Sequence, residues 1–314
     1  MNLLDSMRYL VALEQHRHFG RAAAACHITQ PALSNAIRAL ETELGVSIVK
    51  RGRAFEGLTT EGQRVLASAT VLLHEAEMLR QDLHSTQGQP CGSLSIGAVP
   101  TALPVAARFA AQLRARYNGI KPVVRSLSSQ EIEAGLENLS VDIALGYTER
   151  GSKFTVISQY VEHYFLLRRA AVGAGAGAGE PLQMGAAVTW SEAAQMPLCL
   201  LTPDMHNRSI LDAAFIQAGC SVTPKMETNS IVTMVLSVLD GEMGSVLPGA
   251  LLTLARGYKC LEALPLLDPN VLTPIGFMVA STGRHSRALV AALTLAQDGS
   301  WLRLAAAQGG LQSA

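Results

Sequence analysis

The residues TQPALSNAIR, from Thr29 to Arg38, carry side chains suited to contacting base pairs in DNA. Asn and Gln amides can pair bidentately with adenine, Arg can pair with guanine, and the Ala32 methyl group can contact thymine. The stretch lacks the Glu/Lys mixture of a helix face that meets only water. The candidate DNA contacts here, with Arg21 in the preceding segment, are Thr29, Gln30, Pro31, Ala32, Ser34, Asn35 and Arg38.

Two short helices joined by a tight turn would position these residues. The Ala-rich segment FGRAAAACH favours one helix. Thr29 can cap a second helix, with Pro31 in its first turn, and Gly45 can end it. Its apolar face consists of Leu33, Ile37, Leu40 and Leu44. The pattern predicts a helix-turn-helix, with an ordinary helical hairpin and a solvated outer face as the alternative.

A basic cluster follows the predicted helix pair. Lys50, Arg51 and Arg53 surround a glycine and precede a short turn and the residues LTTEG. This arrangement predicts a hairpin wing in which Arg51 and Arg53 contact backbone phosphates or the minor groove. A solvated basic turn is the alternative.

The segment from Thr60 to Leu83 has a heptad pattern of apolar residues. These residues recur at alternating steps of four and three: Val65, Ala69, Leu72, Ala76, Leu79 and Leu83. The rest of the segment is too polar for burial on several sides, with Glu75, Glu77 and Arg80 among its residues. We therefore favour a dimerisation helix over a core helix of the same chain.

Beyond residue 90, short apolar segments alternate with amphipathic ones, which predicts a parallel α/β sheet. Hydroxyl and amide side chains follow the predicted strands at helix starts, where backbone N–H groups bind small anions. The candidate ligand contacts are Thr101, Ser128, Ser129, Thr202, His206, Asn207 and Arg208. Each Ser or Thr has a plain helix cap as its alternative role, and Arg208 has a surface position or a hinge ion pair.

Composition and motifs argue against several other functions. The 314 residues balance 25 Lys and Arg against 25 Asp and Glu, so DNA binding must rest on a local patch. The five cysteines are widely spaced without CxxC, and no GxSxG, Walker or HExxH motif occurs, so we expect no metal, cofactor or catalytic residue. The glycine-rich stretch 171–181 reads as a surface loop. Neither a signal peptide nor a membrane-spanning run is evident, and we expect a cytoplasmic protein.

The run MRYLVALEQHRHFGRAAAACHITQPALSNAIRALETELGVSIVKRGRAFEGLTTEGQRVL resembles the LysR-type transcriptional regulator family. It departs from the family pattern at SIVKR, at Asn35 and at AFEG, which affects the base preference and not the fold. The resemblance implies a winged helix-turn-helix at 1–59, and a linker helix and hinge at 60–89. It also implies a two-lobed effector domain at 90–314, similar to type 2 periplasmic binding proteins. Lobe I would comprise 90–165 and 269–314, and lobe II 166–268.

The same resemblance implies a function. The chain would be a DNA-binding regulator that recognises an inverted repeat in a promoter and responds to a small-molecule effector, a small organic anion. It would assemble from dimer to tetramer and act with RNA polymerase. The alternative is a solute-binding or enzymatic α/β protein with an unrelated helical N-terminal extension.

Overall fold

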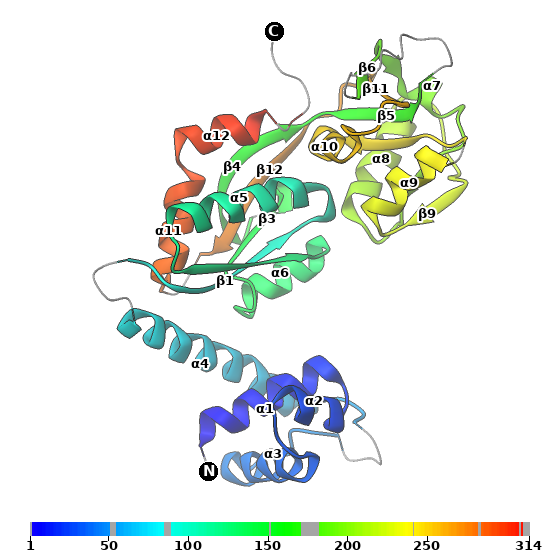
Figure 1. The fold of residues 1–314 in the computed structure, drawn as a ribbon. Coiled ribbons are helices and arrows are strands. Elements are labelled where there is room, and N and C mark those ends of the chain that lie inside the picture. Colours follow the sequence, from blue (N-terminus) through cyan, green and yellow to red (C-terminus); the bar gives the residue numbers. More distant parts are fainter. Residues whose placement is uncertain are drawn as a thin grey trace. The chain divides into compact units, whose positions relative to one another are not determined.

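The computed structural model describes residues 2–50, 55–84, 89–150, 152–170, 182–240, 242–281, 284–307 and 309 (Figure 1). The chain forms two compact units: Met1–Gly88 with Asn138–Ser140, and Gln89–Glu137 with Val141–Ala314. The predicted wing cations Arg51 and Arg53, and the predicted glycine-rich loop, lie outside the described residues. Among the helices that are described, none is both long and apolar enough to cross a membrane.

The described residues of the first unit form four helices, and the predicted helix pair is confirmed. The helices are α1 (Leu3–His16), α2 (Phe19–Ala25), α3 (Gln30–Leu44) and α4 (Thr60–His84). Thr29 caps α3 by accepting the Ala32 N–H at 3.4 Å, and Gly45 ends it with a φ of 67°. Of the predicted apolar face, Leu33, Ile37 and Leu40 enter the core, whereas Leu44 at the helix end is 41% exposed.

The turn after α3 is fixed by a side chain of α3 itself. Glu41 Oε1 accepts the N–H groups of Ile48 at 2.7 Å and Val49 at 3.1 Å. Val49 then pairs with Leu58 in an antiparallel bridge, which forms the base of the predicted hairpin. The first turn of α4 lies against this base, and a Cβ on Gly62 would stand 2.1 Å from the Ile48 carbonyl oxygen. Only glycine fits at this position.

Within the first unit, the later part of α4 leaves its apolar stripe open. Ala69 is buried, whereas Leu79 is 61% exposed and Leu83 is 74% exposed. Large apolar side chains in a row on one helix face mark an interaction surface more often than a solvated one. The stripe matches the predicted heptad positions.

Lobe I of the second unit is a five-stranded sheet in the order β2-β1-β3-β12-β4. Its strands are β1 (Gly92–Ala98), β2 (Ile120–Ser126), β3 (Ile143–Tyr147), β4 (Phe154–Glu162) and β12 (Thr273–Ala280). Apolar residues of four helices pack on the sheet: α5 (Leu103–Arg116), α6 (Ser129–Glu137), α11 (Arg287–Ala296) and α12 (Gly299–Ala306). The predicted parallel pairing holds for β1, β2 and β3, but β12 runs antiparallel to both β3 and β4, so the sheet is mixed.

Lobe II is built around a second sheet in the order β10-β5-β11-β6. Its strands are β5 (Tyr164–Arg169), β6 (Gln183–Met184), β7 (Val188–Thr189), β10 (Ser245–Pro248) and β11 (Leu261–Leu267), with β8 (Cys199–Leu201) and β9 (Met226–Thr228) as a separate pair. Its helices are α7 (Trp190–Ala193), α8 (His206–Gln217), α9 (Ile231–Asp240) and α10 (Leu252–Ala255). Alternate residues of β5 enter two separate cores, so both faces of the sheet are covered.

The chain crosses between the two lobes twice. The first crossing is His163, between β4 and β5, and the second follows Leu267 and leads into β12. The two crossings are adjacent, because Glu162 at the end of β4 pairs with Thr273 at the start of β12. Two adjacent connections of this kind form a hinge.

A carboxyl group is buried at this hinge. Glu162 is fully buried, its Oε1 accepts one long hydrogen bond of 3.4 Å from the Tyr160 hydroxyl, and its Oε2 has no partner among the described residues. Burial raises the pKa of Glu162 to about 8, an effect that the Tyr160 hydrogen bond only partly offsets. Burial raises the pKa of the Tyr147 and Tyr164 hydroxyls, and the charge of Glu162 raises it further. The hinge therefore holds a carboxyl group that is neutral at pH 7.

The variant Glu162→Gln should remove a pH-dependent loss of stability. The pKa of Glu162 is about 8 in the folded chain against 4.5 for a free carboxyl, so the folded state binds the extra proton. The stabilisation by protonated Glu162 is complete below pH 4.5 and falls by about 1.4 kcal/mol per pH unit until about pH 8. Urea unfolding between pH 5 and 9, followed by tryptophan fluorescence, measures this loss of stability. Both tryptophans, Trp190 and Trp301, lie in the second unit, so the signal reports its unfolding.

The control is Glu137→Gln, which changes an exposed carboxylate of the same lobe. Relative to the wild type, the Glu162→Gln variant should gain stability as pH rises, and the control should not. A difference between Glu162→Gln and wild type that stays constant with pH would contradict the burial argument.

Candidate functional site

The predicted DNA-contacting residues of α3 form an exposed stripe. Leu33, Ala36, Ile37 and Leu40 are buried on the opposite side of the helix. Of the predicted residues in α2, at the α3 cap and in α3, only Ser34 is half-buried, and the exposed ones are Arg21, Thr29, Gln30, Pro31, Ala32, Asn35 and Arg38. In the described part of the chain neither Arg21 nor Arg38 forms an ion pair. Both guanidinium groups are therefore available to phosphates or bases.

A pocket of about 160 Å³ lies between the two lobes. Lobe I contributes Ser129, Gln130 and Arg150, and lobe II contributes the segment from Pro203 to His206 and Ser209. The pocket is mostly polar, and it meets the first turns of both α6 and α8. It therefore lies where the sequence predicts a ligand, at helix starts that follow strand ends.

The two predicted serines at the start of α6 differ in their hydrogen bonds. Ser128 is a cap: its Oγ accepts the Glu131 N–H at 3.3 Å, and Glu131 Oε2 accepts the Ser128 N–H at 2.8 Å. This reciprocal pair is a capping box. Ser129 Oγ is shielded from solvent, and it forms no hydrogen bond with a described residue. Of the two, Ser129 is thus the one with a hydroxyl left for a ligand.

The start of α8 has no side-chain cap. The N-cap residue is Met205, whose thioether does not accept a hydrogen bond from the first turn. Thr202, which precedes the pocket segment, has a shielded Oγ1 with no partner in the described chain. A helix N-terminus without a capping oxygen retains N–H donors and a partial positive charge that an anion can satisfy.

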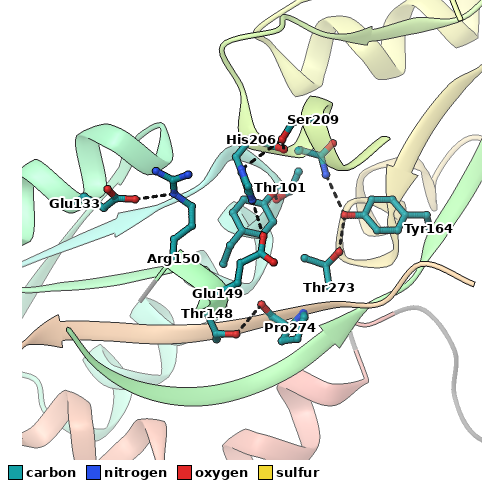
Figure 2. Close-up of polar contacts among 12 residues, drawn as sticks. Thr101, Glu133, Thr148, Glu149, Arg150, Tyr164, His206, Ser209, Thr273 and Pro274 are labelled. Carbon is teal, nitrogen blue, oxygen red and sulfur yellow. Dashed lines mark hydrogen bonds and ion pairs between the residues drawn. The ribbon is translucent and has the colours of Figure 1, made fainter. Parts of the chain in front are cut away.

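Two other predicted contacts lie behind the pocket instead of lining it. Thr101 is buried and shares a hydrogen bond of 3.1 Å with the Tyr147 hydroxyl. Asn207 is also buried, and its Nδ2 donates to the Tyr164 hydroxyl at 3.3 Å. Tyr164 in turn pairs with Thr273 at the hinge, at 3.1 Å (Figure 2). These side chains connect the pocket wall to the hinge.

Arg208 is held in an ion-pair network within lobe II. Its guanidinium donates to Asp212 at 2.8 Å, to Glu227 at 2.6 Å and to the Leu201 carbonyl at 2.8 Å. Only 9% of the side chain is exposed, and it does not line the pocket. Arg208 therefore occupies neither a surface position nor a hinge ion pair, but forms ion pairs within lobe II that tie α8 to β8 and β9.

Two residues near the pocket were missed in the sequence. Arg150 lines the pocket and donates from Nε to Glu133 at 2.6 Å, and Glu149 accepts a hydrogen bond from His206 of the other lobe at 2.8 Å (Figure 2). Both follow β3 directly. The rule that ligand contacts lie beyond the carboxyl ends of parallel strands could have found them, had it been applied to the third strand as well.

The cysteines do not form a reactive site in the pocket. Cys199 is fully buried in β8, and burial raises the pKa of its thiol, as it does for Cys26 in the first unit. A reactive thiol needs a lowered pKa and access to its oxidant. Among the described residues, no group of three His, Cys, Asp or Glu side chains could hold a metal ion.

Family models match both units of the chain. Residues 4–63 match the model of a bacterial regulatory helix-turn-helix protein of the lysR family. Residues 87–300 match the LysR substrate binding domain. A helical extension unrelated to regulators, the alternative interpretation of the sequence, is therefore wrong.

Individual relatives agree with the family models. The hydrogen peroxide-inducible genes activator of Pectobacterium carotovorum subsp. carotovorum is 35% identical over 147 residues, 46% of this chain and 48% of the relative. That match spans about half the length of the relative. The DNA-binding transcriptional dual regulator OxyR of Escherichia coli (strain K12) is 26% identical over 281 residues, 88% of this chain and 89% of that protein.

Among solved structures, full-length CbnR in complex with its target DNA has a TM-score of 0.68 at 16% identity, covering 98% of this chain and 100% of that chain. At this identity the likeness shows a shared fold. With both family models matched in order, the chain belongs to the LysR family of bacterial regulatory helix-turn-helix proteins.

Proposed function

We propose that this chain regulates transcription by binding promoter DNA through α3, and that a small organic anion in the pocket between the lobes controls that binding. The chain's own chemistry is recognition, and we assign it no catalytic residue. The proposal has three parts: a DNA face, a self-association surface and a ligand pocket.

The DNA face is the exposed stripe of α3. Its side chains near the helix start are short and polar, so the helix can approach the floor of a major groove closely. The partial positive charge at the start of α3 favours a phosphate nearby. Arg38 and Asn35 offer guanidinium and amide groups to base edges. The wing residues Arg51 and Arg53 would add phosphate contacts, as the sequence predicts.

The self-association surface is the exposed stripe of α4. Pairing two copies through Leu72, Leu79 and Leu83 would bury side chains that one chain's first unit leaves open. A dimer presents two copies of α3, which fits an inverted repeat in double-stranded DNA. Further pairing to a tetramer and contact with RNA polymerase remain part of the proposal by analogy with the family.

The ligand pocket rests on one observation above the others. Ser129 in lobe I and Thr202 in lobe II each hold a shielded hydroxyl that lacks a described partner. Shielded polar atoms are normally paired. Ser129 lines the pocket and Thr202 directly precedes its lining segment in the chain, so we infer a ligand that satisfies both. The Arg150 guanidinium and the uncapped start of α8 favour a negative charge on that ligand. A bridging ligand would bias the hinge toward one angle of the lobes.

The names of several relatives refer to hydrogen peroxide, so oxidation of a cysteine is the alternative to weigh here. The buried thiol of Cys199, with its raised pKa, is a poor nucleophile toward a peroxide. The pocket is lined by hydroxyl, amide, imidazole and charged groups. These features favour reversible binding of an anion over oxidation of a cysteine.

The variant Asn35→Ala should relax base preference at one position of each half-site. A bidentate amide contact discriminates by about 1–3 kcal/mol, so the preferred base should lose roughly tenfold of its advantage. Selection from random duplexes, followed by titration at fixed salt, measures this preference. Thr42→Ala is the matched control, two turns further along the same face and away from the helix start. Equal preferences in Asn35→Ala and wild type would exclude Asn35 as a base contact.

The variant Leu79→Asp should shift the full chain from dimer to monomer. The side chain is 61% exposed within its own unit, so a carboxylate there disturbs self-association and not folding. Sedimentation velocity across a hundredfold range of concentration measures the shift. Arg80→Asp places the same group one residue off the stripe and should leave the assembly intact. Loss of assembly in both variants, or in neither, would argue against the stripe.

The variant Thr202→Val should abolish stabilisation by the effector and leave the free protein at least as stable. Valine keeps the shape and removes a hydroxyl that has no partner, so the midpoint of thermal unfolding without ligand should stay equal or rise. An effector at a hundred times its dissociation constant should stabilise the wild type by about 2.7 kcal/mol. A panel of small organic and inorganic anions, with hydrogen peroxide beside it, identifies that effector.

The control for this variant is Thr294→Val, an exposed position of lobe I whose hydroxyl bonds only to its own helix. It should keep the full response to the anion, and Ser129→Ala should lose it as Thr202→Val does. A full response in both Thr202→Val and Ser129→Ala would place the ligand elsewhere.

A further inference from the structure

A polar contact between Glu149 and His206, which lines the pocket, joins the two lobes. Glu149 Oε1 of lobe I accepts a hydrogen bond from His206 Nε2 of lobe II at 2.8 Å (Figure 2). The imidazole ring also stands edge-on to the Tyr147 ring of lobe I, with 4.7 Å between the ring centroids. His206 thus touches lobe I through both its nitrogen and its ring.

The backbone around Glu149 is anchored on both sides. Glu149 is the middle residue of a 3₁₀ turn, Thr148–Arg150, that follows β3. Thr148 Oγ1 donates to the Pro274 carbonyl at 3.4 Å, and Arg150 Nε donates to Glu133 at 2.6 Å. These contacts with β12 and α6 leave the Glu149 side chain as the part of the turn that reaches lobe II (Figure 2).

His206, the partner of Glu149 in lobe II, is the first residue of α8. His206 is held from its own lobe by Ser209, whose Oγ lies 3.5 Å from His206 Nδ1 and donates to the His206 carbonyl at 2.7 Å. The helix start carries a partial positive charge, and its N-cap residue Met205 offers no oxygen. A carboxylate from lobe I therefore contacts the side chain of the residue that begins α8, a helix start that favours negative charge.

We propose that Glu149 is a resident carboxylate that latches lobe II to lobe I through His206, and that a carboxylate effector acts by taking its place. The Glu149 side chain is 59% exposed, so it can leave for water at little cost in solvation. The ligand class is then set by the latch itself: a small molecule with a carboxylate for the start of α8 and a polar group for Ser129. The ligand part of this inference rests on the proposed function, whereas the latch itself does not.

Hydrogen–deuterium exchange of the full chain tests the latch, with residues 203–209 as the reporter. The variants are Glu149→Ala and the control Glu137→Ala, which removes an equally charged, exposed carboxylate of the same lobe outside the pocket. The probe is sodium acetate, the free counterpart of the Glu149 carboxylate, compared with sodium chloride at equal ionic strength.

Without acetate, Glu149→Ala should raise the exchange rate of the reporter segment about two- to fivefold, the range expected for losing a charge at a helix start. The Glu137→Ala control should match the wild type. Acetate should then restore protection in Glu149→Ala and act at lower concentration there than in the wild type, where it must compete with the resident group. Chloride should do neither.

Unchanged exchange in Glu149→Ala without ligand would overturn the latch. Equal acetate dependence in Glu149→Ala and wild type would overturn the competition between Glu149 and the ligand. Faster exchange in Glu149→Ala, together with no anion that stabilises any variant, would keep the latch and remove the proposed effector. The two proposals can thus fail separately.

Discussion

The pairing of β4 with β12, where the chain crosses between the lobes, is the constraint on which the pocket depends. Thr273 lies opposite Glu162, so both crossings run through one short piece of sheet. This arrangement holds the two lobes at a common edge and leaves bending there as the simplest relative motion. The starts of α6 and α8 meet at one pocket because both lobes are attached at this place. A protonated Glu162 fits this position, since an unpaired charge buried there would be destabilising.

Behind the pocket, buried polar side chains are mostly satisfied by one another. Tyr164 bonds to Asn207 and Thr273, and Tyr147 bonds to Thr101. Such a network is rigid when every member is paired, and it links the pocket wall to both hinge strands. The exceptions are informative for the same reason. The hydroxyls of Ser129 and Thr202, which lack a partner among the described residues, are for this reason our candidates for ligand contacts.

The periodic parts of the fold were predictable from the sequence, because local spacing determines them. The cap at Thr29, the glycine at the end of α3 and the heptads of α4 are read within one turn or one heptad. Strand β11 was not predicted, since Pro265 interrupts its apolar run and its partners are β5, β6 and β7. The antiparallel insertion of β12 likewise depends on contacts far away in the chain.

The site was predictable as a place and less so as a set of side chains. Strand ends and helix starts indicated the edges of both lobes at which the pocket lies. Whether a hydroxyl there caps a helix, as in Ser128, or stays free, as in Ser129, depends on a neighbour three residues away. Arg208 was ambiguous because Glu227, which pairs with it, is distant in sequence. The contact of Glu149 with His206 could not be predicted, because it depends on which part of lobe II faces it.

The most direct test of the account compares the effect of DNA on the affinity for the anion with the effect of the anion on the affinity for DNA. The dissociation constant of the identified anion is measured on the full chain alone and with a saturating duplex selected from random sequence. The duplex affinity is then measured with and without the anion. Linkage requires the two shifts to be the same factor, and allosteric couplings of this kind are typically about 5- to 150-fold. A regulator whose pocket controls its DNA face should show this common factor. An anion affinity that is unchanged by DNA, with DNA affinity unchanged by the anion, would contradict the account.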